Sequence, residues 1–265
     1  MHRSSPESYD RPPVSQETLT FARLLKYMLL SGLHNETPTY RLRLFYLFHR
    51  FVKEARNDLS PDICVNIIES IRDVLTIEVQ IPEPDEVEID PLTDAVKSST
   101  FDSQLYLYET TGTLCTCLPK ESDQQGTLLL SCVKPLMANL SDCLQVVKGG
   151  SQEVVPIVHT HHIIMALGNI AKGFPDYPSP VPSDFLFPLA NVFSQIAQAI
   201  LICLEAMNIF KVVRDAVCSS FSASWTYSVF SDSLRICTYF GYCWSSCHTV
   251  YSAIDVQSPG AVRAI

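Results

Sequence analysis

Apolar residues recur at three- and four-residue steps in one segment after another, and short turn-forming stretches separate these segments. This spacing places the apolar side chains on one face of an α-helix. A first helix is predicted from Thr18, and two more are predicted to begin at Thr37-Pro38 and Ser60-Pro61, because proline is favoured in the first turn of a helix. The same period predicts further helices at residues 103–118, 126–147, 153–172, 183–207 and 208 to about 217.

About eight helices with short links and no convincing strand leave two architectures, a closed bundle or a stack of antiparallel helix pairs. Only 9 glycines occur in 265 residues, which argues against turn-rich sandwiches and barrels. Taken in pairs, the helix starts are spaced close to the repeat length of HEAT units. We therefore predict an all-α, HEAT-like α-solenoid of stacked antiparallel helix pairs over residues 16–217, after a disordered lead-in at residues 1–15.

Two segments depart from this pattern. Residues 81–94 contain three prolines and six acidic residues, and we expect a solvated acidic loop. Residues 218–265 contain four charged residues and no sustained helical period, so we expect a poorly structured C-terminal tail. A shifted reading frame or a retained intron is one hypothesis for this tail, and a genuine apolar tail that faces a membrane or a partner is the alternative.

The motifs of the common enzyme classes are absent from the sequence. It contains no phosphate-binding glycine loop, nucleophile elbow or dinucleotide fingerprint, so we expect no catalysis and no cofactor. His159 and His162 have the spacing of metal ligands on a helix, but no third ligand follows at a matching interval, and an ordinary polar turn is the favoured interpretation. The ten cysteines follow a polar N-terminus without an apolar signal core, which indicates reduced thiols.

Charge and hydropathy restrict the partners. A net charge of -9 excludes a generally basic surface that clamps nucleic acid, so any RNA contact has to be local. Residues 185–207 form the best candidate for a membrane span, but polar residues interrupt them and a buried helix is favoured. No membrane association is therefore expected.

The most informative cations lie on the second predicted helix. Arg43, Arg50 and Lys53, with Tyr46 among them, share a face opposite the apolar stripe of that helix. This face could hold phosphates on the concave wall of a solenoid, or it could be a solvated outer face. Arg41 and Lys172 are secondary candidates for the same role.

Four stretches together resemble the exportin-T family of tRNA exportins, within the importin-β-like karyopherins. They are RLRLFYLFHRFVK (41–53), DSQLYLYETTGTL (102–114), HHIIMALGNIAKGFP (161–175), and AQAILICLEAMN (197–208) running into VRDA (213–216). The third is the most specific, because the stretch from Gly168 to Pro175 is an unusual way to end a helix. The resemblance covers roughly residues 18–217.

The resemblance implies a HEAT solenoid that wraps tRNA cooperatively with the Ran GTPase in its GTP form. It also implies contacts with nuclear pore proteins and shuttling between nucleus and cytoplasm. Family members are much longer than this chain, which we therefore expect to be a fragment of such a receptor. For RNA contact the expected residues are Arg43, Arg50 and Lys53, with Arg41 and Lys172 behind them. The alternative function is a HEAT-type protein-binding scaffold that does not bind RNA.

Overall fold

The computed structural model describes residues 16–82, 90–119, 123–175 and 189–222. Within these ranges the fold is entirely helical, with nine α-helices, two short helical turns of other types and no strand. This confirms the predicted all-α class. The lead-in at residues 1–15, most of the acidic loop (83–89), the first residues of the predicted 183–207 helix, and residues 223–265 of the tail lie outside the described ranges.

The observed helices follow the predicted order with small shifts at their ends. They are α1 (Gln16–Tyr27), α2 (Pro38–Ala55), α3 (Pro61–Ser70), α4 (Pro91–Ser98), α5 (Phe101–Thr116), α6 (Gln124–Lys148), α7 (Val154–Lys172), α8 (Ala190–Met207) and α9 (Lys211–Ser222). A π-helical turn (Met28–Gly32) follows α1, and a 3-10 turn (Asp73–Leu75) follows α3.

The short helix α4 corrects the prediction that residues 81–94 form a loop throughout. Its first residue is Pro91, and the side chain of Asp90 accepts a hydrogen bond from the Thr93 backbone N–H at 3.2 Å. Composition alone assigns Asp90 and Pro91 to the loop, whereas in the structure Asp90 caps the helix and Pro91 begins it. The apolar residues that follow pack against the core and hold this helix in place.

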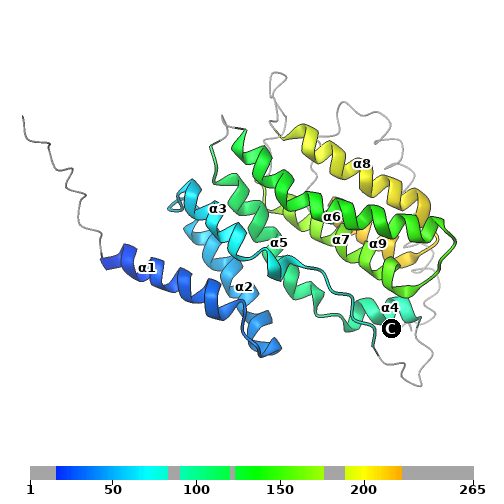
Figure 1. The fold of residues 1–265 in the computed structure, drawn as a ribbon, viewed down its shortest axis with the longest axis horizontal. Coiled ribbons are helices and arrows are strands. Elements are labelled where there is room, and N and C mark those ends of the chain that lie inside the picture. The colour runs from blue at the N-terminus through cyan, green and yellow to red at the C-terminus, as the bar shows by residue number, and fades with distance from the viewer. Residues whose placement is uncertain (1–15, 83–89, 120–122, 176–188, 223–265) are drawn as a thin grey trace, which may run out of the picture.

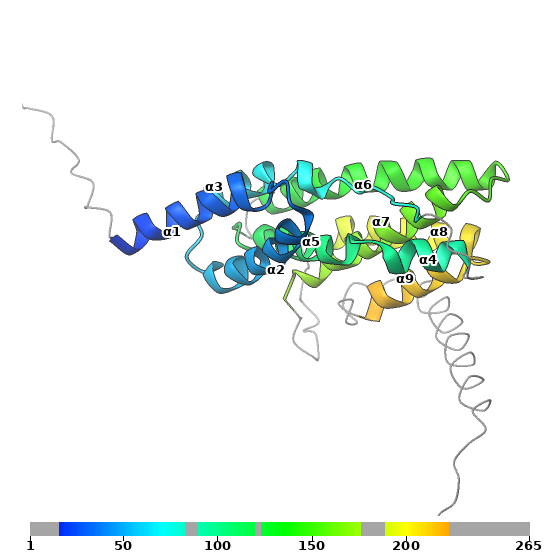
Figure 2. The same cartoon turned by 90° about the horizontal axis from the view of Figure 1, so that it is seen from below.

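The long helices form two interleaved rows. In one row α5 packs between α2 and α7, and α7 packs in turn against α9. Helix α6 packs along α7 and against α8 in the other row, as Figure 1 shows. From α5 to α9, successive helices of the chain thus alternate between the rows, which is the arrangement of a helical solenoid. Figure 2 shows α4 beside α9, on the side of α7 away from α6.

Contacts along the first row show that its helices run in the same direction. Tyr46 near the middle of α2 meets Tyr106 of α5, and the Cys117 thiol after α5 donates to the carbonyl of Arg56 after α2. Phe101 at the start of α5 stacks on His162, and Thr113 near its end reaches the carbonyl of Gly173. The C-terminal ends of α2, α5 and α7 therefore lie side by side, whereas the start of α5 meets the middle of α7.

Helix α7 lies at the centre of the fold. Among the helices of the described ranges, it alone has the length and hydropathy of a membrane span, and 72% of that stretch is buried within the protein. Its contacts with five other helices account for this apolar composition. The predicted span candidate at residues 185–207 overlaps α8, which contributes several residues to the same apolar core.

The predicted boundary at residue 217 falls inside a helix. Helix α9 continues to Ser222, five residues beyond that boundary. Ser220 is buried, and its hydroxyl donates to the carbonyl of Ile164 on α7 at 3.0 Å. The beginning of the segment predicted to be an atypical tail is thus part of the packed fold.

Candidate nucleic-acid interface

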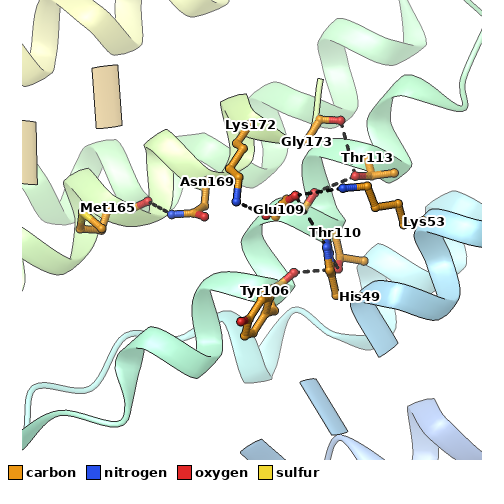
Figure 3. A network of polar contacts seen from close by, with 10 residues as sticks. All are labelled: His49, Lys53, Tyr106, Glu109, Thr110, Thr113, Met165, Asn169, Lys172 and Gly173. Carbon is orange, nitrogen blue, oxygen red and sulfur yellow. Dashed lines mark hydrogen bonds and ion pairs between the residues drawn. The ribbon is translucent and has the colours of Figure 1, made fainter. Parts of the chain in front are cut away.

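A single carboxylate lies where three helices of the first row meet. Glu109 of α5 lies 2.8 Å from the ammonium of Lys172 on α7 and 3.8 Å from that of Lys53 on α2. On the α2 side, His49 Nε2 also lies 3.6 Å from the same carboxylate. Figure 3 shows the two lysines reaching Glu109 from opposite sides. Two of the five predicted phosphate-binding residues are therefore brought together, although 119 positions separate them in the sequence.

Burial distinguishes the carboxylate from the two lysines. The side chain of Glu109 is 8% exposed, whereas those of Lys53 and Lys172 are 59% and 46% exposed. The acid therefore lies beneath the surface, and the two ammonium groups remain accessible to solvent. A long side chain can pack its methylenes against the protein while its charged end stays in water.

The segment around Glu109 explains how a charge is accommodated between helices. The neighbouring hydroxyls of Thr110, Thr111 and Thr113 donate to backbone carbonyls four residues earlier in α5. They are thereby satisfied within their own helix. A buried carboxylate needs compensating cations, and α2 and α7 supply one lysine each.

His49 contributes no positive charge near neutral pH. Burial lowers its pKa, and the nearby lysines Lys53 and Lys172 lower it further, whereas the charge of Glu109 acts in the opposite direction. Its Nδ1 lies 3.2 Å from the hydroxyl of Thr110. The local charge is therefore that of two ammonium groups and one carboxylate.

Arg50 is neutralised locally. Its guanidinium donates to Glu54 at 3.3 Å, one turn further along α2, and both side chains are largely exposed. Exposed pairs of this kind contribute little to stability because water and salt screen them, so a phosphate could displace Glu54 at small cost. Tyr46 on the same side of the helix packs edge-on against Tyr106 of α5.

Arg41 and Arg43 lie at the other end of α2. Arg43 is exposed and Arg41 is half-buried, and within the described ranges neither makes an ion pair or a side-chain hydrogen bond. Ten residues separate Arg43 from Lys53, a rise of about 15 Å along a helix. The predicted cationic face of α2 is therefore extended, and only its Lys53 end joins the cluster with Lys172.

Glu109 and His49 were not among the predicted site residues. A signal for Glu109 was present in the sequence, because it stands in the stretch LYLYETTGTL without another charged residue. An isolated acid on a helix that is apolar on most sides indicates burial and requires a partner. The identity of that partner depends on the packing of α2 and α7, which periodicity within one helix does not predict.

The histidine turn of α7 is part of the core. His161 and His162 are buried, their Nδ1 atoms lie 3.1 Å apart, and the ring of His162 stacks on Phe101 with centroids 4.2 Å apart. The prediction of an ordinary polar turn is therefore wrong, because two of its histidines lie in the core. Across the described part of the chain, no group of three His, Cys, Asp or Glu side chains is placed to hold a metal ion, and no disulfide joins the cysteines.

Comparisons with known proteins, by family model and by individual relatives, give the same family. A sequence model of the Exportin-T family matches residues 15–228. The chain is 58% identical to the Exportin-T of Laccaria bicolor over 191 residues and 53% identical to that of Coprinopsis cinerea over 192 residues. The Exportin-T of Mycosarcoma maydis is 32% identical over 194 residues. Each match covers 72% of this chain but only 17–18% of the relative, so the chain spans about a fifth of the length of these proteins.

Proposed function

Because this chain belongs to the exportin-T family, we propose that it forms part of a nuclear export receptor for tRNA. In this proposal the receptor binds tRNA cooperatively with Ran in its GTP form. It moves between nucleus and cytoplasm through contacts with nuclear pore proteins, and it acts by binding rather than by catalysis. The described helices supply one section of the solenoid wall that contacts RNA.

The pair of exposed lysines from separate helices is the observation that carries the RNA-binding part of this proposal. Lys53 and Lys172 present two ammonium groups on one surface. Arg50 and Arg43 add two further exposed, positively charged side chains along α2. The net charge of -9 works against adsorption of RNA to the protein as a whole. RNA affinity would therefore have to come from such a local group of cations.

The solenoid offers a physical route to cooperativity. Each helix packs mainly against the helices next to it in the stack. Small changes in helix packing therefore add up along the stack to a change in its curvature. Two ligands that favour the same curvature strengthen each other, and the coupling is reciprocal. We propose that tRNA and Ran-GTP are coupled in this way.

The test is direct binding of labelled tRNA to the 265-residue chain over a range of salt concentrations. We expect an affinity that falls steeply with salt, because each neutralised phosphate releases counterions. Replacing both Lys53 and Lys172 by glutamine should reduce the logarithmic salt slope by about 1–2 units. Lys134→Gln is the matched control, because this exposed lysine lies on α6 in the other row.

Two results would contradict the proposal. One is the absence of salt-dependent tRNA binding even at low ionic strength. The other is an equal loss of affinity from the control and from the double variant. A protein partner that stays bound after nuclease treatment and at high salt, in place of tRNA, would favour the protein-scaffold alternative. For the cooperative part, Ran-GTP should tighten tRNA binding and tRNA should tighten Ran binding by the same factor.

A further inference from the structure

The Glu109 carboxylate occupies the inner side of the surface formed by Lys53 and Lys172. Its two oxygens are shared between the two cations, since Oε2 receives the hydrogen bond from Lys172 and Oε1 is the atom nearest to Lys53. The two lysine side chains are about half exposed, and the acid between them is nearly covered. An anion that approaches from solvent therefore meets two lysines that already have a negative partner.

We propose that Glu109 is an internal competitor for RNA phosphate, which lowers the affinity of the two-lysine site. This inference rests on the proposed function, because it concerns the regulation of the same surface. A bound phosphate has to share Lys53 and Lys172 with the carboxylate. The complex is then weaker and dissociates more readily than two unpaired lysines would allow, which suits a receptor that has to release its cargo.

Charge balance supports this role. With His49 neutral, two ammonium groups and one carboxylate leave a net charge of one at the junction. An approaching phosphate is attracted by both lysines and repelled by Glu109, and the low polarity around the buried carboxylate weakens screening of that repulsion. Replacing the acid by its uncharged isostere removes the repulsion and doubles the net local charge.

Glu109 differs in its surroundings from Glu54, the other acid near the predicted site. Glu54 pairs with Arg50 on one helix, and both side chains are well exposed. Solvent and ions screen that pair, and Glu54 can move away when a phosphate arrives. Glu109 is fixed between α2 and α7 and cannot withdraw, so its charge persists in the bound state.

The experiment compares tRNA binding by the unmodified chain, Glu109→Gln and the matched control Glu54→Gln across a series of salt concentrations. We expect Glu109→Gln to bind tRNA about fivefold more tightly, the factor of a near-surface ion pair. Its logarithmic salt slope should be steeper by about 0.7–0.9, since one more phosphate charge is neutralised. The control should change affinity less than twofold.

The possible outcomes distinguish the two proposals. If the unmodified chain binds tRNA and Glu109→Gln binds with equal or lower affinity and an unchanged slope, Glu109 is only a structural link and the inference is overturned. If neither protein binds tRNA, the proposed function and this inference fail together. Tight binding by the variant alone supports the internal competitor while contradicting the proposed affinity of the natural chain.

A second variant keeps the inference testable if Glu109→Gln fails to fold. Asn169 lies one turn before Lys172 on α7, half-buried, and its amide donates to the carbonyl of Met165. Asn169→Asp adds a second negative charge one turn from Lys172 with little change in size. It should weaken tRNA binding several-fold at low salt, and this loss should shrink as salt increases. An unchanged affinity would overturn the inference independently.

Discussion

Gly112 of α5 lies against the backbone of Ile170 on α7, so closely that a Cβ atom on Gly112 would lie 2.0 Å from the Ile170 carbonyl oxygen. Gly173, just after α7, makes a reciprocal approach, since a Cβ there would lie 2.4 Å from the carbonyl oxygen of Glu109. The absence of side chains at these two positions brings the helices into backbone contact. This contact holds Glu109 within reach of Lys172.

The first prediction concerns this contact. Gly112→Ala should destabilise the fold by about 3 kcal/mol or more, because the methyl group meets a helix backbone that cannot rotate away. The free energy of unfolding from urea titration measures the effect. Gly126→Ala on α6 is the control, because its new Cβ would make only an ordinary contact with Leu189, and helix propensity favours alanine by up to about 1 kcal/mol. Equal unfolding midpoints for the two variants would contradict the prediction.

Local sequence signals were sufficient to predict most helices. The Ser60-Pro61 start is an example, since the Ser60 hydroxyl accepts a hydrogen bond from the Ile63 backbone N–H and Pro61 begins the helix. Periodicity then gave the buried faces of α2 and α3 because each depends on one helix alone. The same reasoning missed α4, whose start looked like part of an acidic, proline-rich loop.

The candidate site was less predictable because it depends on contacts between helices. Lys53 and Lys172 could be named as cations from the sequence, but their shared partner Glu109 follows from the registers of α2, α5 and α7. Those registers depend on close approaches such as Gly112 to Ile170, which have no signature within one helix. Pairing across a solenoid therefore needs the packed structure, even where every helix is assigned correctly.

The second prediction concerns the buried histidines of α7. Burial lowers the pKa of His161 to about 4, and burial with the neighbouring histidines lowers that of His162 to about 3. The unfolded chain binds protons near pH 6.5 while the folded chain does not, so stability should be full above about pH 7 and should fall as the pH drops toward 5. We expect a loss of up to about 2 kcal/mol for each histidine in this window.

Urea unfolding at several pH values between 7 and 5 measures this dependence. Most carboxylates titrate below this window, and Cys117, with a pKa of about 7, titrates at its upper edge, so the histidines dominate the change between pH 6.5 and 5. His161→Gln should make the dependence shallower, because one of the buried neutral rings is removed. A stability that is constant over the window would contradict the burial of these rings.

The third prediction concerns thiol reactivity. A hydrogen bond with Cys64 lowers the pKa of Cys117 to about 7, and Cys117 is partly exposed at the end of α5. A hydrogen bond with Cys132, together with burial, raises the pKa of Cys115 well above its usual range. Among the cysteines in the described ranges, alkylation near neutral pH should therefore modify Cys117 at least about tenfold faster than Cys115. Mass spectrometry of digested protein gives both rates.

Cys64→Ala provides the control for this mechanism. Without its hydrogen-bond partner, the Cys117 thiol should have a higher pKa and should react more slowly. Faster alkylation of Cys115 than of Cys117 in the folded chain would refute the assignment. Unchanged reactivity of Cys117 in the Cys64 variant would show that exposure alone, rather than the hydrogen bond, sets its rate.

The fourth prediction concerns the end of the folded region. Helix α9 packs so closely against Gly168 of α7 that a Cβ atom on this glycine would lie 2.6 Å from the side chain of Ser220. Ser220 is buried there and donates to the carbonyl of Ile164. A chain that ends after Val217 loses this contact and the last turn of α9, whereas a chain that ends after Ser222 retains both.

We therefore expect the chain ending at residue 217 to unfold at a lower temperature than the chain ending at 222, with a loss of about 1–3 kcal/mol. Ser220→Ala in the longer chain should lose about 1 kcal/mol, since it removes the hydrogen bond and keeps the packing. Thermal unfolding of the three proteins under the same conditions separates the two contributions. Identical melting temperatures for the two truncated chains would mean that residues 218–222 add nothing to the fold, and the predicted boundary at 217 would then stand.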